Sequence, residues 1–150
     1  MNNICYVPLQ GGESVSFTVP DPAAGANWLY TIPAGYEYEI RALQCKLTTA
    51  AAGGVRYPLF VIYDTAANDH WRLYFTRTIP NTGETAVFSL YRLCRRADFS
   101  IVPVAGNSSY NDAIPACRLP QLFQIGAAFS GLNVADQWSE IRIIAHRWRT

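Results

Sequence analysis

At residues 57–63 the chain reads Tyr57-Pro58-Leu59-Phe60-Val61-Ile62-Tyr63, a continuous apolar segment of strand length. Such a segment is expected where a β-strand is covered on both of its faces. Pro58 has no backbone N–H to donate, so it should lie at the start of the strand or on a sheet edge. The segment therefore predicts a β-strand that is buried from two sides.

Segments on either side of this strand alternate as β-strands do. Residues 14–19 place apolar side chains on one face and hydroxyl side chains on the other. Residues 36–47 also alternate, but the apolar side changes midway, which predicts either a β-bulge or a strand that passes from one sheet to another. In the last segment, residues 138–148, Ile141, Ile143 and Ala145 face one way.

Turn-forming residues recur at short intervals along the whole chain, which suits short strands and leaves little room for helices. No segment keeps a 3.6-residue apolar period for three turns. Further strands are predicted at residues 71–75, 86–93, 99–104 and 122–129, giving about eight in total. We therefore predict an all-β fold: one domain, residues 1–150, built as an antiparallel β-sandwich. A jelly roll is preferred to an immunoglobulin-like sandwich because the strand count is nearer eight than seven and no Cys-Trp-Cys spacing occurs.

The composition is poor in charge. Only 15% of the residues are charged, 13% are aromatic, and Lys46 is the single lysine among twelve cationic residues. Soluble monomers carry about a quarter charged residues, whereas interfaces lose Lys, Glu and Asp and gain aromatic residues and Arg. The chain is therefore predicted to be covered by other protein chains.

The net charge of +1 is spread along the sequence, so charge predicts neither a nucleic-acid partner nor a membrane partner. The first residues lack a basic leader and no apolar run is long enough for a spanning helix, so we expect a protein made in the cytoplasm and kept there until it assembles. Its cysteines, Cys5, Cys45, Cys94 and Cys117, form no C-x-x-C pair. They are interpreted as reduced thiols, and spacing leaves open whether any of them pair.

Few residues offer catalytic chemistry. The chain has two histidines, His70 and His146, and lacks the nucleophile-elbow, zinc-protease, P-loop and dinucleotide motifs. The histidines are expected to be surface or hydrogen-bonded residues, and aspartates near strand ends are expected to form turns. We therefore predict no enzyme activity, no cofactor and no metal.

Two cationic groups are candidates for interfaces. Arg92, Arg95 and Arg96 form the denser group, and Arg147 and Arg149 close the chain. Nucleic acid is disfavoured as their partner because lysine is scarce and no nucleic-acid motif occurs, which leaves a solvated face or a protein interface. Two tryptophans, Trp138 and Trp148, are interpreted either as core residues or as interface anchors.

Several stretches resemble small structural proteins of tailed bacteriophages: Ile32-Pro33-Ala34-Gly35 leading into residues 36–49, then residues 55–64, and Asp136-Gln137-Trp138-Ser139 before the last strand. The resemblance covers roughly residues 30 to 148 and is one of general pattern. It implies a capsid cement (decoration) protein, which sits on the virion surface, oligomerises and clamps adjacent subunits of the major capsid protein. Trimers are slightly favoured over dimers by the same resemblance. The resemblance identifies no binding residue in this sequence.

Two other functions stay open. The first is a tail or fibre module that binds a host glycan through exposed Trp and Tyr near carboxylates, with Tyr110-Asn111-Asp112 as its candidate. The second is a cupin-like or hydrolytic enzyme on the same fold, which a stoichiometric metal would indicate. Copy number separates shell from tail, because closed icosahedral symmetry repeats a shell site on the order of hundreds of times.

Overall fold

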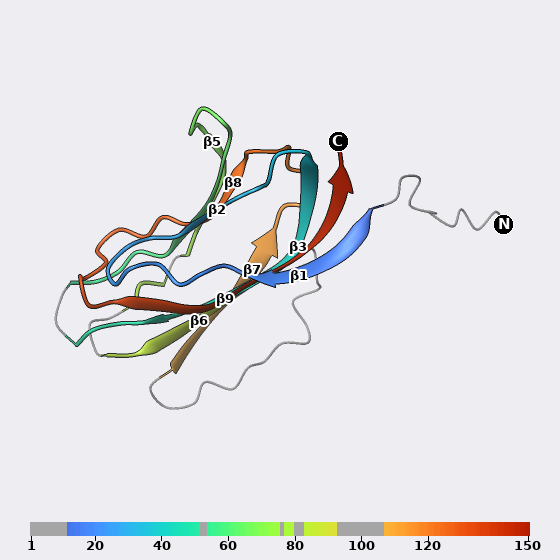
Figure 1. Cartoon of the computed structure of the whole chain (residues 1–150). Coiled ribbons are helices and arrows are strands. Elements are labelled where there is room, and N and C mark those ends of the chain that lie inside the picture. The colour runs from blue at the N-terminus through green and yellow to red at the C-terminus, as the bar shows by residue number, and fades with distance from the viewer. Residues whose placement is uncertain (1–11, 52–53, 76, 80–82, 93–106) are drawn as a thin grey trace.

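The computed structural model of the chain describes residues 12–51, 54–75, 77–79, 83–92 and 107–150. Within those residues there is no helix, and nine strands form two sheets (Figure 1). The larger sheet has the order β1-β9-β3-β6-β7 and the smaller has the order β2-β8-β4-β5. The prediction of an all-β fold with two packed sheets is confirmed.

The strand bounds follow the alternating segments closely. The larger sheet contains β1 (Glu13–Thr18), β3 (Tyr36–Thr48), β6 (Thr85–Arg92), β7 (Asn107–Ile114) and β9 (Gln137–Arg149). The smaller sheet contains β2 (Leu29–Thr31), β4 (Leu59–Tyr63), β5 (Asp69–Tyr74) and β8 (Gln124–Ala127). The strand predicted at residues 99–104 lies outside the described residues.

The longest strands, β3 and β9, pair with each other and form the centre of the larger sheet (Figure 1). The register between them shifts between Ile40 and Ala42, where the buried positions of β3 change from Tyr38 and Ile40 to Leu43 and the residues that alternate with it. This irregularity is the bulge expected from the change of apolar side in residues 36–47. It lets one long strand keep apolar side chains on the core through both halves.

Two strands, β7 and β2, differ from the expectations drawn from the sequence. Strand β7 pairs with β6 in parallel, although every other strand pair is antiparallel. A parallel neighbour needs a connection of about a dozen residues or more, and residues 93–106 join these two strands. Strand β2 is only three residues long and was not predicted.

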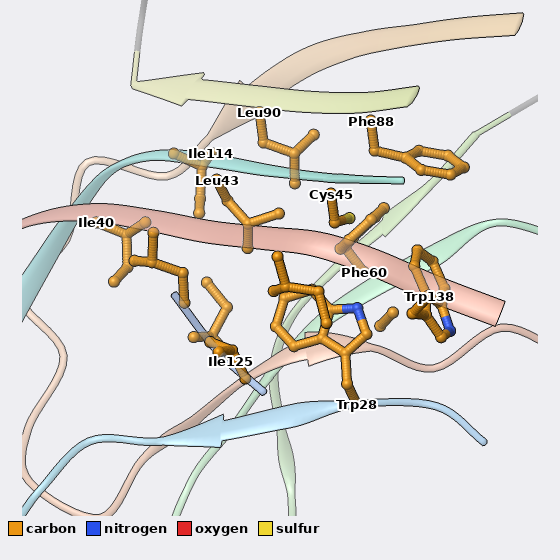
Figure 2. Close-up of a cluster of buried hydrophobic side chains, with 14 of the residues drawn as sticks. Trp28, Ile40, Leu43, Cys45, Phe60, Phe88, Leu90, Ile114, Ile125 and Trp138 are labelled. Carbon is orange, nitrogen blue, oxygen red and sulfur yellow. The ribbon is translucent and has the colours of Figure 1, made fainter. Parts of the chain in front are cut away.

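The core lies between the sheets and is rich in aromatic side chains (Figure 2). Phe60 of β4 contacts Phe88 of β6 with ring centroids 5.3 Å apart, and Trp28 meets Trp138 edge to face at 6.4 Å. Edge-to-face and tilted packing of such rings adds to the stabilisation from buried area. The core thus holds the two sheets in fixed positions and fixes the surfaces that their ends and outer faces present.

A buried ion pair joins two loops at the edge of this core. Arg56 donates from Nε to Asp136 Oδ2 at 2.8 Å and from a terminal guanidinium nitrogen to Asp136 Oδ1 at 2.7 Å, and both side chains are 0% exposed. Asp136 also accepts hydrogen bonds from the backbone N–H groups of Ala50 and Asn133, each at 2.8 Å. Burial raises the pKa of Asp136, but the hydrogen bonds from Arg56 and the backbone outweigh it and leave the pKa below its usual value.

Candidate functional site

The end of β9 is the first candidate site. In the sheet, β9 is paired on one side with β1 and on the other with β3, so Arg147 lies opposite Glu13 and Trp148 lies opposite Glu37 (Figure 1). Directly opposed residues share a face of a sheet, with side chains close enough to interact. The register therefore places Arg147 and Glu13 on one face of the sheet and Trp148 and Glu37 on the other, all at the end of β9.

Arg118 joins this group from the segment before β8. The neighbouring Leu119 exchanges backbone hydrogen bonds with Tyr38, at 3.0 and 2.7 Å, which places Arg118 beside β3. The Arg118 guanidinium carbon lies 3.9 Å from the centre of the Trp148 ring, and a guanidinium nitrogen is 3.4 Å from Glu37 Oε2. A guanidinium stacked on an indole is an attractive cation–π contact, so one face of Trp148 is already covered.

Arg147 makes a parallel arrangement nearby. Its Nε donates to Glu13 Oε1 at 2.6 Å, and its guanidinium carbon lies 5.1 Å from the centre of the Tyr36 ring. The hydrogen bonds from Arg147 to Glu13 and to Tyr38 raise the pKa of the guanidinium above its usual value. Arg147 is therefore charged, as arginine side chains in proteins are.

These residues line an open pocket of about 490 Å³, here called the arginine groove. Its lining combines Glu13, Tyr36, Glu37, Arg118, Trp148, Thr150 and the last two arginines, Arg147 and Arg149. Arg118 and Arg147 each pair with a glutamate, whereas Arg149 forms no ion pair within the part of the chain that the structure describes. The side chains that line the groove thus include three guanidinium groups and two carboxylates.

The outer face of the smaller sheet is the second candidate site. Phe60 and Ile62 of β4 face the core, so the alternate residues Leu59, Val61 and Tyr63 face away from it. Val61 is 0% exposed but belongs to no core cluster, and the strand register places it between Arg72 and Gly126. The apolar strand thus has a second apolar face on the outside of the sandwich.

Large apolar side chains surround this second face of β4. Tyr57 is 57% exposed, Tyr74 of β5 is 61% exposed and Leu29 of β2 is 43% exposed. Leu59 lies opposite Tyr74 in the register, and Leu29 lies opposite Gly126. We call the surface made by Leu29, Tyr57, Leu59, Tyr63 and Tyr74 the tyrosine face. Exposed apolar patches of this kind mark interaction sites.

Charge is scarce on the tyrosine face. Arg72 pairs with Asp69 on the same strand, and it also donates to the Tyr74 hydroxyl at 3.0 Å. Because Arg72 and Asp69 neutralise each other, a partner that displaces water from this face buries no unpaired charge of this pair. Tyrosine with a satisfied hydroxyl contributes large contact area at little cost in conformational entropy, and it is a frequent interface anchor.

The structure separates the residues that the sequence marked for an interface. Arg147, Trp148 and Arg149 all line the arginine groove, whereas Arg92 pairs with Glu39 along the sheet. Arg95 and Arg96 lie outside the described residues. Trp138 was offered as a core residue or an interface anchor, and it is buried between the sheets against Phe88, Phe129 and Trp28, so it is a core residue.

The glycan candidate at residues 110–112 is also corrected. The Tyr110 side chain is buried and stacks on Phe88 with ring centroids 4.7 Å apart, because β7 turns this side chain into the core. It therefore offers no exposed ring for a sugar. In the described residues, no three His, Cys, Asp or Glu side chains gather as a metal site would need.

The sequence did not identify Arg118, Glu13 or Glu37 as site residues, because their proximity depends on register. The unbroken apolar segment at residues 57–63 predicted a strand covered on both faces, and Phe60, Val61 and Ile62 are indeed buried. The exposed tyrosines beside its outer face were not predicted. Cys45 is buried and Cys117 half-buried, and both carry free thiols. No described helix is long and apolar enough to cross a membrane.

Comparisons with protein-family models, curated proteins and solved structures find no match.

Proposed function

We propose that this protein is a structural component of a bacteriophage virion that binds the outside of the capsid and clamps adjacent major capsid subunits. The observation that carries the proposal is the tyrosine face. Strand β4 is apolar on both faces, and beside its outer face Tyr57, Tyr74 and Leu29 are 57%, 61% and 43% exposed. Because exposed apolar side chains are costly in water, a protein surface that covers them gains free energy from burial.

The composition of the tyrosine face suits a protein partner. Its exposed side chains are tyrosines and a leucine, and its charged pair, Arg72 and Asp69, is neutralised within the face. Interface cores have this aromatic character and this depletion of unpaired charge. A shell also presents many identical sites, so each contact can be modest while the assembled layer binds firmly.

The strand order supports the jelly-roll assignment within the same proposal. If β7 is set aside as an addition to the edge, the remaining eight strands in chain order occupy one sheet as first, eighth, third and sixth. They occupy the other sheet as second, seventh, fourth and fifth. Chains that wind between two sheets in this way form the double Greek key of jelly rolls, a common architecture of capsid proteins.

Binding to empty shells tests the tyrosine face directly. Tyr57→Arg and Tyr74→Arg together place two charges on the face without touching the core, and we expect them to abolish co-sedimentation with shells. Ile144→Arg is the matched control, because Ile144 is 42% exposed on the opposite, larger sheet. Equal binding by the wild type and the tyrosine double variant would refute the proposed surface.

The proposal includes association between copies, with trimers favoured over dimers. Light scattering of the purified protein, alone and bound to shells, measures this directly. A trimer is expected where the protein occupies threefold positions of the shell and a dimer where it occupies twofold positions. If the protein is a monomer both free in solution and bound to shells, self-association is refuted. Binding of single copies to the shell through the tyrosine face would then be the part of the proposal that stands.

A host-glycan module of a tail or fibre is the second candidate. The observation that favours it is the arginine groove, where Trp148 and Tyr36 lie beside Glu37 and Glu13. Aromatic rings beside carboxylates are a typical sugar-binding set. The number of copies per particle distinguishes the candidates, because a shell protein occurs on the order of hundreds of times and a tail protein a handful of times.

A further inference from the structure

We propose that the arginine groove is a binding site for a carboxylate-bearing saccharide. This inference does not depend on where in a particle the protein sits, because it rests on the groove and not on the tyrosine face. The groove has the volume of a small-ligand site, about 490 Å³.

The unpaired guanidinium selects a negative ligand. Arg118 is held by Glu37 at 3.4 Å and by the Trp148 ring, and Arg147 is held by Glu13 at 2.6 Å. Arg149 lines the same groove without an ion pair among the described residues. A guanidinium presents a planar fork of donors that fits a carboxylate with two parallel hydrogen bonds. Arg149 is therefore the residue that binds the ligand's carboxylate.

The two glutamates require hydrogen-bond donors on the ligand. Each carboxylate has room for several hydrogen bonds, and Glu13 and Glu37 are each shown with one arginine partner. Sugar hydroxyls donate to carboxylates and accept from guanidinium groups at the same time. A ligand with a carboxylate and several hydroxyls on one ring matches both sets of groups, whereas a simple anion would leave the glutamates facing it without a donor.

The backbone around the groove argues against an extended peptide as the ligand. Strand β9 pairs with β1 as far as Arg147 and with β3 as far as Arg149, and Thr150 N donates to Gly35 O at 3.1 Å, so most of its backbone hydrogen-bonding groups are used within the sheet. A peptide that binds as an added strand needs free backbone groups on a sheet edge. The groove offers side chains instead, which suits a ligand recognised through hydroxyl and carboxylate groups.

The two aromatic residues shape the groove. Trp148 contacts both Arg118, whose guanidinium carbon is 3.9 Å from the ring centre, and His146, whose ring centroid is 4.7 Å away. The rings therefore act mainly as supports that hold the guanidinium groups in position, and the ligand meets ring edges and charged planes. Holding polar groups in place before binding reduces the entropy that a ligand must pay to order them.

Nuclear magnetic resonance titration tests the site on the full chain. The indole N–H signal of Trp148, assigned with Trp148→Phe, is followed during addition of glucuronate, with glucose and acetate as matched probes. Glucose lacks the carboxylate and acetate lacks the hydroxyls. We expect a saturable shift with glucuronate at millimolar concentrations, a much weaker response to either control probe, and no shift of the core Trp28 signal.

Matched variants locate the contact. Arg149→Gln should weaken glucuronate binding about tenfold, the loss expected for one charge-assisted hydrogen-bonded contact. Arg142→Gln, an exposed arginine on the same strand that does not line the groove, should leave it unchanged. Equal shifts with acetate, equal shifts with glucose, no saturable shift, or equal weakening by the two variants would each overturn the proposal. Shell binding by Arg149→Gln should stay at the wild-type level, which separates this site from the tyrosine face.

Discussion

Replacing Asp136 with asparagine should destabilise the protein strongly, because it leaves the Arg56 guanidinium buried without a counter-charge. Both side chains are fully buried, and Asp136 accepts two hydrogen bonds from Arg56 at 2.7 and 2.8 Å. Breaking a buried pair by removing one partner costs about 3–5 kcal/mol. That is a large share of the roughly 5–15 kcal/mol that stabilises a typical domain.

The assay is urea unfolding followed by tryptophan fluorescence, supported by thermal melting. With about 2–4 °C of melting temperature per kcal/mol for a chain of this size, Asp136→Asn should lower Tm by about 6–20 °C. Glu140→Gln is the control, because it removes one partner of the exposed Lys46–Glu140 pair at 2.6 Å, which should cost less than about 1 kcal/mol. If Asp136→Asn costs no more than Glu140→Gln, the reasoning about the buried pair is refuted.

A coupled variant separates charge burial from lost packing. Arg56→Met together with Asp136→Asn removes the unpaired guanidinium, so the double variant should be more stable than Asp136→Asn alone.

The stability of the wild type should depend on pH on the acid side. The pKa of Asp136 is lowered by folding, so its contribution is present above the ordinary carboxyl value of about 4 and is lost as pH falls through the lowered value. Asp136→Asn should flatten this acid-side loss.

Three smaller predictions concern the fold. Gly126→Ala should destabilise by roughly 1–3 kcal/mol in urea unfolding, because a Cβ there collides with the Trp28 carbonyl oxygen; an unchanged midpoint would contradict that close approach. Phe60→Ala should cost about 3–5 kcal/mol, whereas Tyr74→Ala on the surface should stay within about 0.5 kcal/mol, and similar costs would mean that Phe60 is not central to the core. Cys45 should resist iodoacetamide until urea unfolds the protein, because burial both shields the thiol and raises its pKa; rapid labelling of the native protein, measured by mass spectrometry, would contradict the burial.

The sequence predicted the larger strands because their apolar alternation depends on local residues. The bulge in residues 36–47 was visible as a change of apolar side, and the register shift after Ile40 confirms it. Strand β7 was missed because all of its residues from Asn107 to Asp112 except Tyr110 are Asn, Ser or Asp, which favour turns over strands. Their strand conformation depends on pairing with β6, which local sequence does not encode.

The candidate surfaces were predictable only in part. Arg147, Trp148 and Arg149 were marked from the sequence, and the structure places all three in one groove. Arg118 joins them through a backbone pairing between Leu119 and Tyr38, across 81 residues of sequence, which no local pattern reveals. The apolar segment at residues 57–63 correctly indicated a strand with two apolar faces. Only the three-dimensional structure shows the exposed side chains of Tyr57, Tyr74 and Leu29 beside the outer face.

The central claim is that the tyrosine face is covered by a capsid subunit in the assembled particle. A cryo-electron microscopy map of a particle that contains this chain measures it directly. We predict copies on the order of hundreds per particle, with Tyr57 and Tyr74 buried against the shell and the larger sheet turned away from it. A map in which the tyrosine face points into solvent, or in which the protein occurs only at the tail, would contradict the account.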